Sequence, residues 1–116
     1  MTPVASTNIP NFLKGNVEYI GYYDGTGTWN HNKNLNRFKY IFFHVYKAQT
    51  SGDTSVEATG FVNVDTLKLY NSITHAFGCS CYNDGARQYG YISWYGTNST
   101  YVQTSAGRGV ALFGIS

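Results

Sequence analysis

Charged residues are scarce in this chain. Of its 116 residues, 12% are Asp, Glu, Lys or Arg, about half of the usual quarter. The Lys and Arg residues stand singly along the sequence, and the net charge is only +2. Nucleic-acid binding depends on a clustered basic surface, so it is not predicted. Asn, Thr, Ser, Gly and Tyr must cover the surface instead, a composition typical of robust extracellular or virion proteins and of sugar-binding domains.

Cysteine is rare as well, with two residues in the chain. Cys79 and Cys81 are separated by one residue, so on a strand they lie roughly 6.5–7 Å apart along the chain. That spacing is at the edge of disulfide geometry, and we expect two small buried thiols. No Cys-x-x-Cys or His pair supplies further ligands, so neither a metal site nor a cofactor is predicted.

Long apolar runs and catalytic motifs are both missing. No run approaches the length of a membrane span, so membrane insertion is not predicted. Residues 1–16 lack the basic start and apolar segment of a signal peptide, and we expect a flexible lead-in. There is no Gly-x-Ser-x-Gly, P-loop or His-Glu-x-x-His motif. A glycosidase would need two carboxylates about 5–9.5 Å apart, and nothing in the sequence brings Asp24 and Asp84 together. The prediction is a protein without catalysis.

Tyrosine and short β-rich segments are what the chain has in abundance. Aromatic residues make up 17% of it, with 11 Tyr, and 13 Gly mark frequent turns. The candidates for a helical turn are residues 11–15 and residues 65–71, the second with Asp65 as its N-cap. The remaining pattern predicts a single all-β domain over residues 17–116, an antiparallel β-sandwich of about seven or eight strands. The expected strands are residues 17–23, 28–29, 38–48, 56–64, 73–82, 87–95, 99–104 and 110–115.

The segment over residues 38–48 is apolar on both faces. Because side chains alternate along a strand, Ile41, Phe43 and Val45 share one face, which we expect to be the core of the sandwich. The other face is aromatic too, and we expect it to contact sister chains or the partner sheet. The residues of this predicted oligomer interface are Tyr40, Phe42, His44 and Tyr46.

Aromatic rings beside polar turns are the candidates for sugar binding. A ring stacks on the C–H face of a sugar while polar side chains bond its hydroxyls. Trp29 is the best single candidate, because it follows a turn and precedes the Asn-rich loop over residues 30–36. The alternative is that rings such as Trp94 are core, and that Asn and Asp only shape turns. The predicted ligand-binding residues are Tyr23, Asp24, Trp29, Asn30, His31, Asp84, Arg87 and Tyr89.

The three histidines have structural explanations that compete with a functional one. His44 lies among aromatic residues, so we expect it to be packed or at a subunit interface. His75 shares a face with Phe77 and is expected to be a satisfied core or rim residue. His31 lies in a loop and is expected to be solvated.

Four segments carry a resemblance to a known family. They are residues 18–25 (EYIGYYDG), 38–43 (FKYIFF), 91–102 (YISWYGTNSTYV) and the ending 110–116 (VALFGIS). Together they make the chain similar to the C-terminal receptor-binding, or head, domains of bacteriophage tail fibres and related tail proteins. The resemblance covers most of the chain after residue 16, and the Asn-rich loop departs from it.

The resemblance implies a compact β-sandwich, usually a homotrimer, that sits extracellularly at the tail tip of a virion and binds a glycan or another receptor on a host cell. Two alternatives stay open. One is a carbohydrate-binding module or lectin of a secreted protein, and the other is a structural virion subunit that binds only protein.

Overall fold

The computed structural model describes residues 16–48, 56–72 and 75–116. Most of these residues lie in strands, with one α-helix, α1 (Val64–Leu69), and one 3-10 helix, η3 (Leu35–Arg37), in the described ranges. The strands are β1 (Val17–Asp24), β2 (Gly27–Asn30), β3 (Tyr40–Lys47), β4 (Val56–Asn63), β5 (Phe77–Asn83), β6 (Ala86–Gly96), β7 (Ser99–Thr104) and β8 (Arg108–Ile115).

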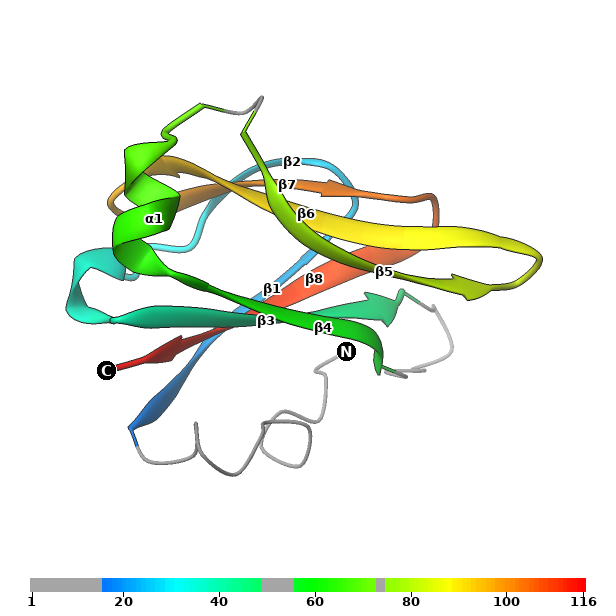
Figure 1. Ribbon diagram of the computed structural model, residues 1–116, viewed down its shortest axis with the longest axis horizontal. Helices are drawn as coiled ribbons and strands as arrows, with labels where there is room; N and C mark the ends of the chain where they lie inside the picture. The colour runs from blue at the N-terminus through cyan, green and yellow to red at the C-terminus, as the bar shows by residue number, and fades with distance from the viewer. Residues whose placement is uncertain (1–15, 49–55, 73–74) are drawn as a thin grey trace.

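The strands form two four-stranded sheets packed face to face (Figure 1). Sheet A has the order β1-β8-β3-β4 and sheet B the order β2-β7-β6-β5. Every neighbouring pair is antiparallel. The predicted all-β sandwich of seven or eight strands is therefore confirmed. The chain passes from sheet A to sheet B through the β1–β2 connection and through α1, which lies at one end of the sandwich (Figure 1).

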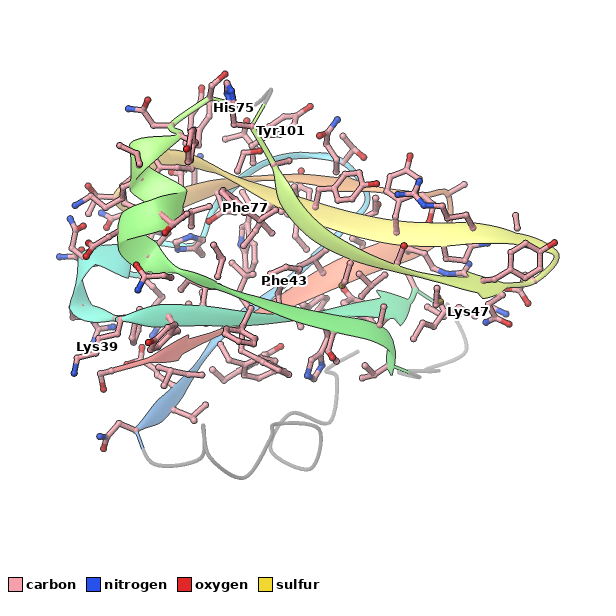
Figure 2. All side chains as sticks on the ribbon, viewed as in Figure 1. Lys39, Phe43, Lys47, His75, Phe77 and Tyr101 are labelled. Atoms are coloured by element: carbon pink, nitrogen blue, oxygen red, sulfur yellow. The ribbon has the colours of Figure 1, made fainter. Side chains whose placement is uncertain are left out.

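The main core lies between the sheets and includes the predicted face of β3. Ile41 and Phe43 are 1% exposed, and Val45 is fully buried. A Cβ built on Gly90 of β6 would lie 2.5 Å from Val45 Cγ2, so Val45 also faces sheet B, and the sheets approach closely there. Trp94 belongs to the same cluster, so the alternative that this ring is core is confirmed. Figure 2 shows Phe43 and Phe77 pointing into the space between the sheets.

A second apolar cluster lies on the outer face of sheet A. It contains Phe42 and Tyr46 from β3 with Phe113 from β8, and all three are buried. His44 shares this face and is 0% exposed, with ring centroids 5.3 Å from Phe42 and 4.8 Å from Phe113. The aromatic pattern on both faces of β3 thus serves two separate clusters.

Side-chain bonds to the backbone shape the turns. Asn32 has φ 63°, in the left-handed region, and the Asn34 side chain accepts from the Asn36 backbone N–H; both are typical of Asn in loops. Asp84 (φ 52°) and Gly85 (φ 78°) form the tight turn between β5 and β6.

The helix cap differs from the prediction. The N-cap of α1 is Asn63, whose Oδ1 accepts from the N–H groups of Asp65 and Thr66. Asp65 instead occupies the first turn, where a negative charge suits the helix dipole. Sequence patterning also placed the start of β5 at residue 73, whereas the strand begins at Phe77. The predicted lead-in, residues 1–16, lies outside the described residues except for Asn16.

Candidate functional site

The outer face of sheet B carries a row of tyrosines. Antiparallel pairing sets Tyr91 of β6 opposite Gln103 of β7 and Gly78 of β5, and it sets Tyr82 opposite Arg87. Residues directly opposite each other share a face, so these side chains lie on the side away from sheet A. Figure 2 shows Tyr101 on that side. We call this surface the tyrosine face; its residues are Tyr82, Arg87, Tyr89, Tyr91, Tyr101 and Gln103.

Two rings and one guanidinium form the centre of the tyrosine face. The rings of Tyr89 and Tyr91 stack with centroids 5.0 Å apart and planes 22° apart. The Arg87 guanidinium carbon lies 5.0 Å from the Tyr89 centroid and 5.8 Å from the Tyr91 centroid. An Arg87 N–H also donates to the Tyr91 hydroxyl. Cation–π attraction and this bond hold the three side chains together at the surface.

A glycine lies beneath the Tyr91 ring. A Cβ built on Gly78 would lie 1.8 Å from Tyr91 Cδ1 and 2.6 Å from the Gly90 carbonyl oxygen. The ring therefore occupies the space that a side chain on the edge strand β5 would fill. This contact fixes Tyr91 as a half-buried platform.

The predicted cluster around Trp29 packs between the edge strands β1 and β2. Trp29 stacks on Tyr23 with centroids 6.0 Å apart, and His31 meets the Trp29 ring edge-on at 5.1 Å. A Cβ on Gly21 would lie 2.9 Å from Trp29 Cζ2. Trp29 and Tyr23 both pack against the main core, so Trp29 is a partly buried packing residue with limited surface to offer a ligand.

His31 is bonded and partly buried, contrary to the expectation that it is solvated. Its Nδ1 accepts from the Lys33 backbone N–H at 3.2 Å, and its Nε2 lies 3.0 Å from Thr100 Oγ1. The neutral ring therefore carries its proton on Nε2 and donates to Thr100. Burial lowers the pKa of His31 to about 4. Asn30, by contrast, is exposed and accepts from the Ser99 hydroxyl at 2.6 Å.

Asp24 lies on a different face from Trp29. Its carboxylate accepts a hydrogen bond from the Tyr46 hydroxyl at 2.5 Å, on the outer side of sheet A. Burial, and next this bond to Asp24, raise the pKa of Tyr46. The pair lies at one end of the second apolar cluster. The Asp24 carboxylate therefore already has a hydrogen-bond partner within the protein.

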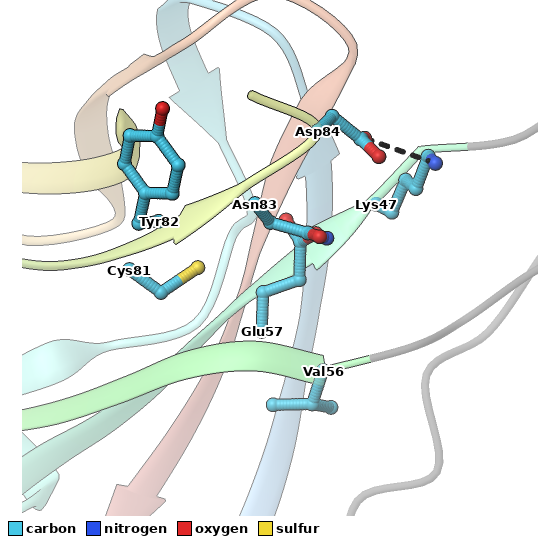
Figure 3. Close-up of a pocket in the computed structure, with 7 residues that line it drawn as sticks. All are labelled: Lys47, Val56, Glu57, Cys81, Tyr82, Asn83 and Asp84. Atoms are coloured by element: carbon cyan, nitrogen blue, oxygen red, sulfur yellow. Dashed lines mark hydrogen bonds and ion pairs between the residues drawn. The ribbon is translucent and has the colours of Figure 1, made fainter. Parts of the chain in front are cut away.

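Asp84 lines an open pocket of about 530 Å³ beside the β5–β6 turn (Figure 3). It forms ion pairs with Lys47 Nζ at 3.0 Å and with Arg108 at 2.8 Å. Hydrogen bonds from Arg108 and then Lys47 lower the pKa of Asp84. Glu57, on the pocket wall, is bonded by Arg108 at 2.5 and 3.1 Å and by Asn83. Arg108 thus joins β8 to β4 and to the turn.

This ion-pair network occupies the two acidic groups of the pocket. The side chains of Arg108 and Glu57 are only 6% and 5% exposed, so neither is free for a ligand. Asp24 does not reach the network, because it bonds Tyr46 on the outer face of sheet A. The eight predicted ligand-binding residues are therefore split among four places, and only Arg87 and Tyr89 of them belong to the tyrosine face.

Three of the four predicted interface residues have almost no surface in a single chain. Phe42 is 2% exposed, His44 and Tyr46 are 0% exposed, and Tyr40 is half-buried. The exposed rings of sheet A are instead Tyr19, at 36%, and Phe61, at 53%. Contact with sister chains stays a prediction.

Sequence reasoning did not single out Tyr91, Tyr101 and Gln103 as one surface. The alternation of Tyr89 and Tyr91 along β6 indicates that they share a face. The sequence does not show how β5 and β7 pair with β6, so it does not show which of their residues join that face.

Comparison with known proteins identifies no relative of this chain. No protein-family model matches the chain, and searches of curated proteins and of solved structures find no match. Within the described ranges, no group of three or more His, Cys, Asp or Glu side chains could hold a metal ion, and no helix has the length and apolarity to cross a membrane. Cys79 and Cys81 are free thiols, and burial raises the pKa of Cys79 to about 11.

Proposed function

We propose that this chain is a non-catalytic receptor-binding domain that recognises a host cell-surface glycan, as the head domains of phage tail fibres do. The observation that carries the proposal is the tyrosine face. Its stacked Tyr89 and Tyr91 rings offer flat apolar surface for the C–H face of a sugar. Around them, Arg87 and Gln103 supply hydrogen-bonding groups for hydroxyls. Aromatic platforms bordered by a few polar groups suit saccharides better than apolar ligands.

The composition of sheet B supports a glycan more than a protein partner. Of the exposed large apolar residues, Tyr82 (77% exposed) lies on this face, whereas Phe61 and Leu69 lie elsewhere. Cores of protein interfaces are enriched in Tyr, Trp, Phe, Met and Arg. The tyrosine face has Tyr and Arg but none of the Trp, Phe or Met of that set, and all six of its side chains carry polar groups that can bond sugar hydroxyls.

The direct test is a glycan array followed by titration of a hit with Tyr91→Ser and with Phe61→Ser. Phe61 is the matched control, because it is an exposed aromatic residue on the opposite sheet. Loss of one stacking ring should weaken binding about tenfold, whereas the control should bind like wild type. Absence of binding across a broad array would favour a structural role and contradict the proposal.

Assembly as a homotrimer, with the virion tail tip as location, is part of the same proposal. The support is the outer face of sheet A, where Tyr19 and Phe61 leave apolar surface around a buried aromatic centre. Sedimentation equilibrium measures the mass directly: a trimer agrees with the fibre hypothesis, and a monomer at micromolar concentration favours a free-standing carbohydrate-binding module.

A further inference from the structure

Sheet B carries one charged side chain in its four strands. The sequences of β2, β5, β6 and β7 contain no Asp, Glu or Lys, and Arg87 is their single Arg. Four other cations of the described chain form ion pairs: Lys33 and Arg37 with Glu18, Lys47 with Asp84, and Arg108 with Glu57 and Asp84. Arg87, like Lys39 and Lys68, forms no ion pair with any described residue, and of these three only Arg87 lies in sheet B. Its positive charge is therefore uncompensated on an aromatic surface.

The geometry fixes the Arg87 guanidinium and leaves most of its donors open. Cation–π contacts with Tyr89 and Tyr91 hold it over the rings, and one N–H donates to the Tyr91 hydroxyl. A guanidinium has five N–H donors in a planar fork that matches a carboxylate. Because the side chain is exposed and already oriented, little rotamer entropy remains to be lost when an anion binds.

From this arrangement we propose that the tyrosine face selects an acidic glycan, one whose sugar ring stacks on Tyr89 or Tyr91 while its carboxylate pairs with Arg87. Sialic acids and hexuronic acids have this chemistry, because each joins an apolar C–H surface to a carboxylate on one ring. The inference rests on the proposed glycan-binding function and adds the class of sugar. The absence of carboxylates from the strands of sheet B removes the repulsion that an acidic ligand would otherwise meet.

The test compares acidic and neutral forms of the same sugar by calorimetry. The probes are sialyllactose against the methyl ester of its sialic acid, and an oligogalacturonide against its methyl ester. One acidic probe should bind about tenfold or more tightly than its neutral form, because a charge-assisted hydrogen bond is stronger than a neutral one. That preference should fall as NaCl is raised from 50 to 500 mM, whereas binding of the neutral form should not change.

Variants of Arg87 test whether this residue causes the preference for acidic over neutral sugars. Arg87→Gln should remove the difference between acidic and neutral forms, and Arg87→Lys should keep part of it because a point charge cannot bind in two places. Lys39→Gln is the matched control, since Lys39 is exposed but lies outside sheet B. All variants should keep the melting temperature of the wild type.

The outcomes separate the two proposals. Equal affinity for acidic and neutral forms, or an unchanged preference in Arg87→Gln, would overturn the acidic-glycan inference while leaving glycan binding intact. Failure of every saccharide on the array, acidic or neutral, would overturn the proposed function itself.

Discussion

Acid should weaken this fold before its carboxylates are protonated, because His44 stays neutral inside it. The imidazole is 0% exposed, packs against Phe42 and Phe113, and has no hydrogen-bond partner at either nitrogen among the described residues. Burial lowers its pKa from 6.5 to about 4. No described carboxylate forms an ion pair with it; Asp24 on the same face is bonded to Tyr46.

The sign follows from proton binding. Below pH 6.5 the unfolded chain takes up a proton on His44, whereas the folded chain does not until about pH 4. The stability contributed by the neutral ring is therefore complete above pH 6.5 and is lost as the pH falls toward 4. Over the whole window the loss is about 3 kcal/mol, and between pH 7 and pH 5 it is about 2 kcal/mol.

Urea denaturation at pH 7, 6 and 5 measures this loss, and His44→Leu isolates it. Leucine has a similar volume and no titrating group, so the variant should lose about 2 kcal/mol less than wild type over the same range. His31 also has a lowered pKa, so some loss should persist in the variant. An identical pH slope in both proteins would refute the reasoning. An NMR titration of the imidazole that gave a pKa near 6.5 would do the same.

Three further perturbations act on single contacts, each read by urea denaturation. Arg108→Met should cost about 3–5 kcal/mol, because it leaves the Glu57 carboxylate buried without its cation; a cost under about 1 kcal/mol would contradict this. Ser93→Ala should raise stability by about 1 kcal/mol, since the Ser93 hydroxyl is buried without a partner in the described chain, and a loss would argue for an unseen bond. Gly78→Ala should cost about 1–3 kcal/mol and weaken glycan binding, because its methyl group displaces the Tyr91 ring; unchanged binding would contradict the tyrosine face as the site.

The sequence predicts the strands well because each is a short β-rich segment bounded by turn residues. Alternation along β3 assigned Ile41, Phe43 and Val45 to the core face without any knowledge of neighbours. The tyrosine face could not be predicted in the same way. It depends on which residue of β5 and β7 lies opposite Tyr91, and that register is set by pairing between segments distant in sequence.

Glycines within strands could have indicated where large rings pack. Gly21 and Gly78 both lie inside strands, where glycine often marks a close approach by another group. In each case that group is a large ring: Trp29 over Gly21, and Tyr91 over Gly78. The position of Trp29 after a turn suggested exposure, but Gly21 provides the space that lets this ring pack against the core. Trp29→Ala therefore changes packing as well as any binding, so loss of affinity in that variant would not locate the ligand.

The two outer faces of the sandwich differ in chemistry. The face of sheet A is an apolar cluster that buries a neutral His44, bordered by the exposed ring of Phe61. The face of sheet B keeps its tyrosine hydroxyls at the surface beside one unpaired cation, Arg87. Because the sheets lie on opposite sides of the core, Phe61→Ser and Arg87→Gln are far apart in the fold and share no contact, so their effects on stability should be additive. If glycan binding uses sheet B and trimer formation uses sheet A, the first variant should alter mass without altering the acidic preference, and the second should do the reverse.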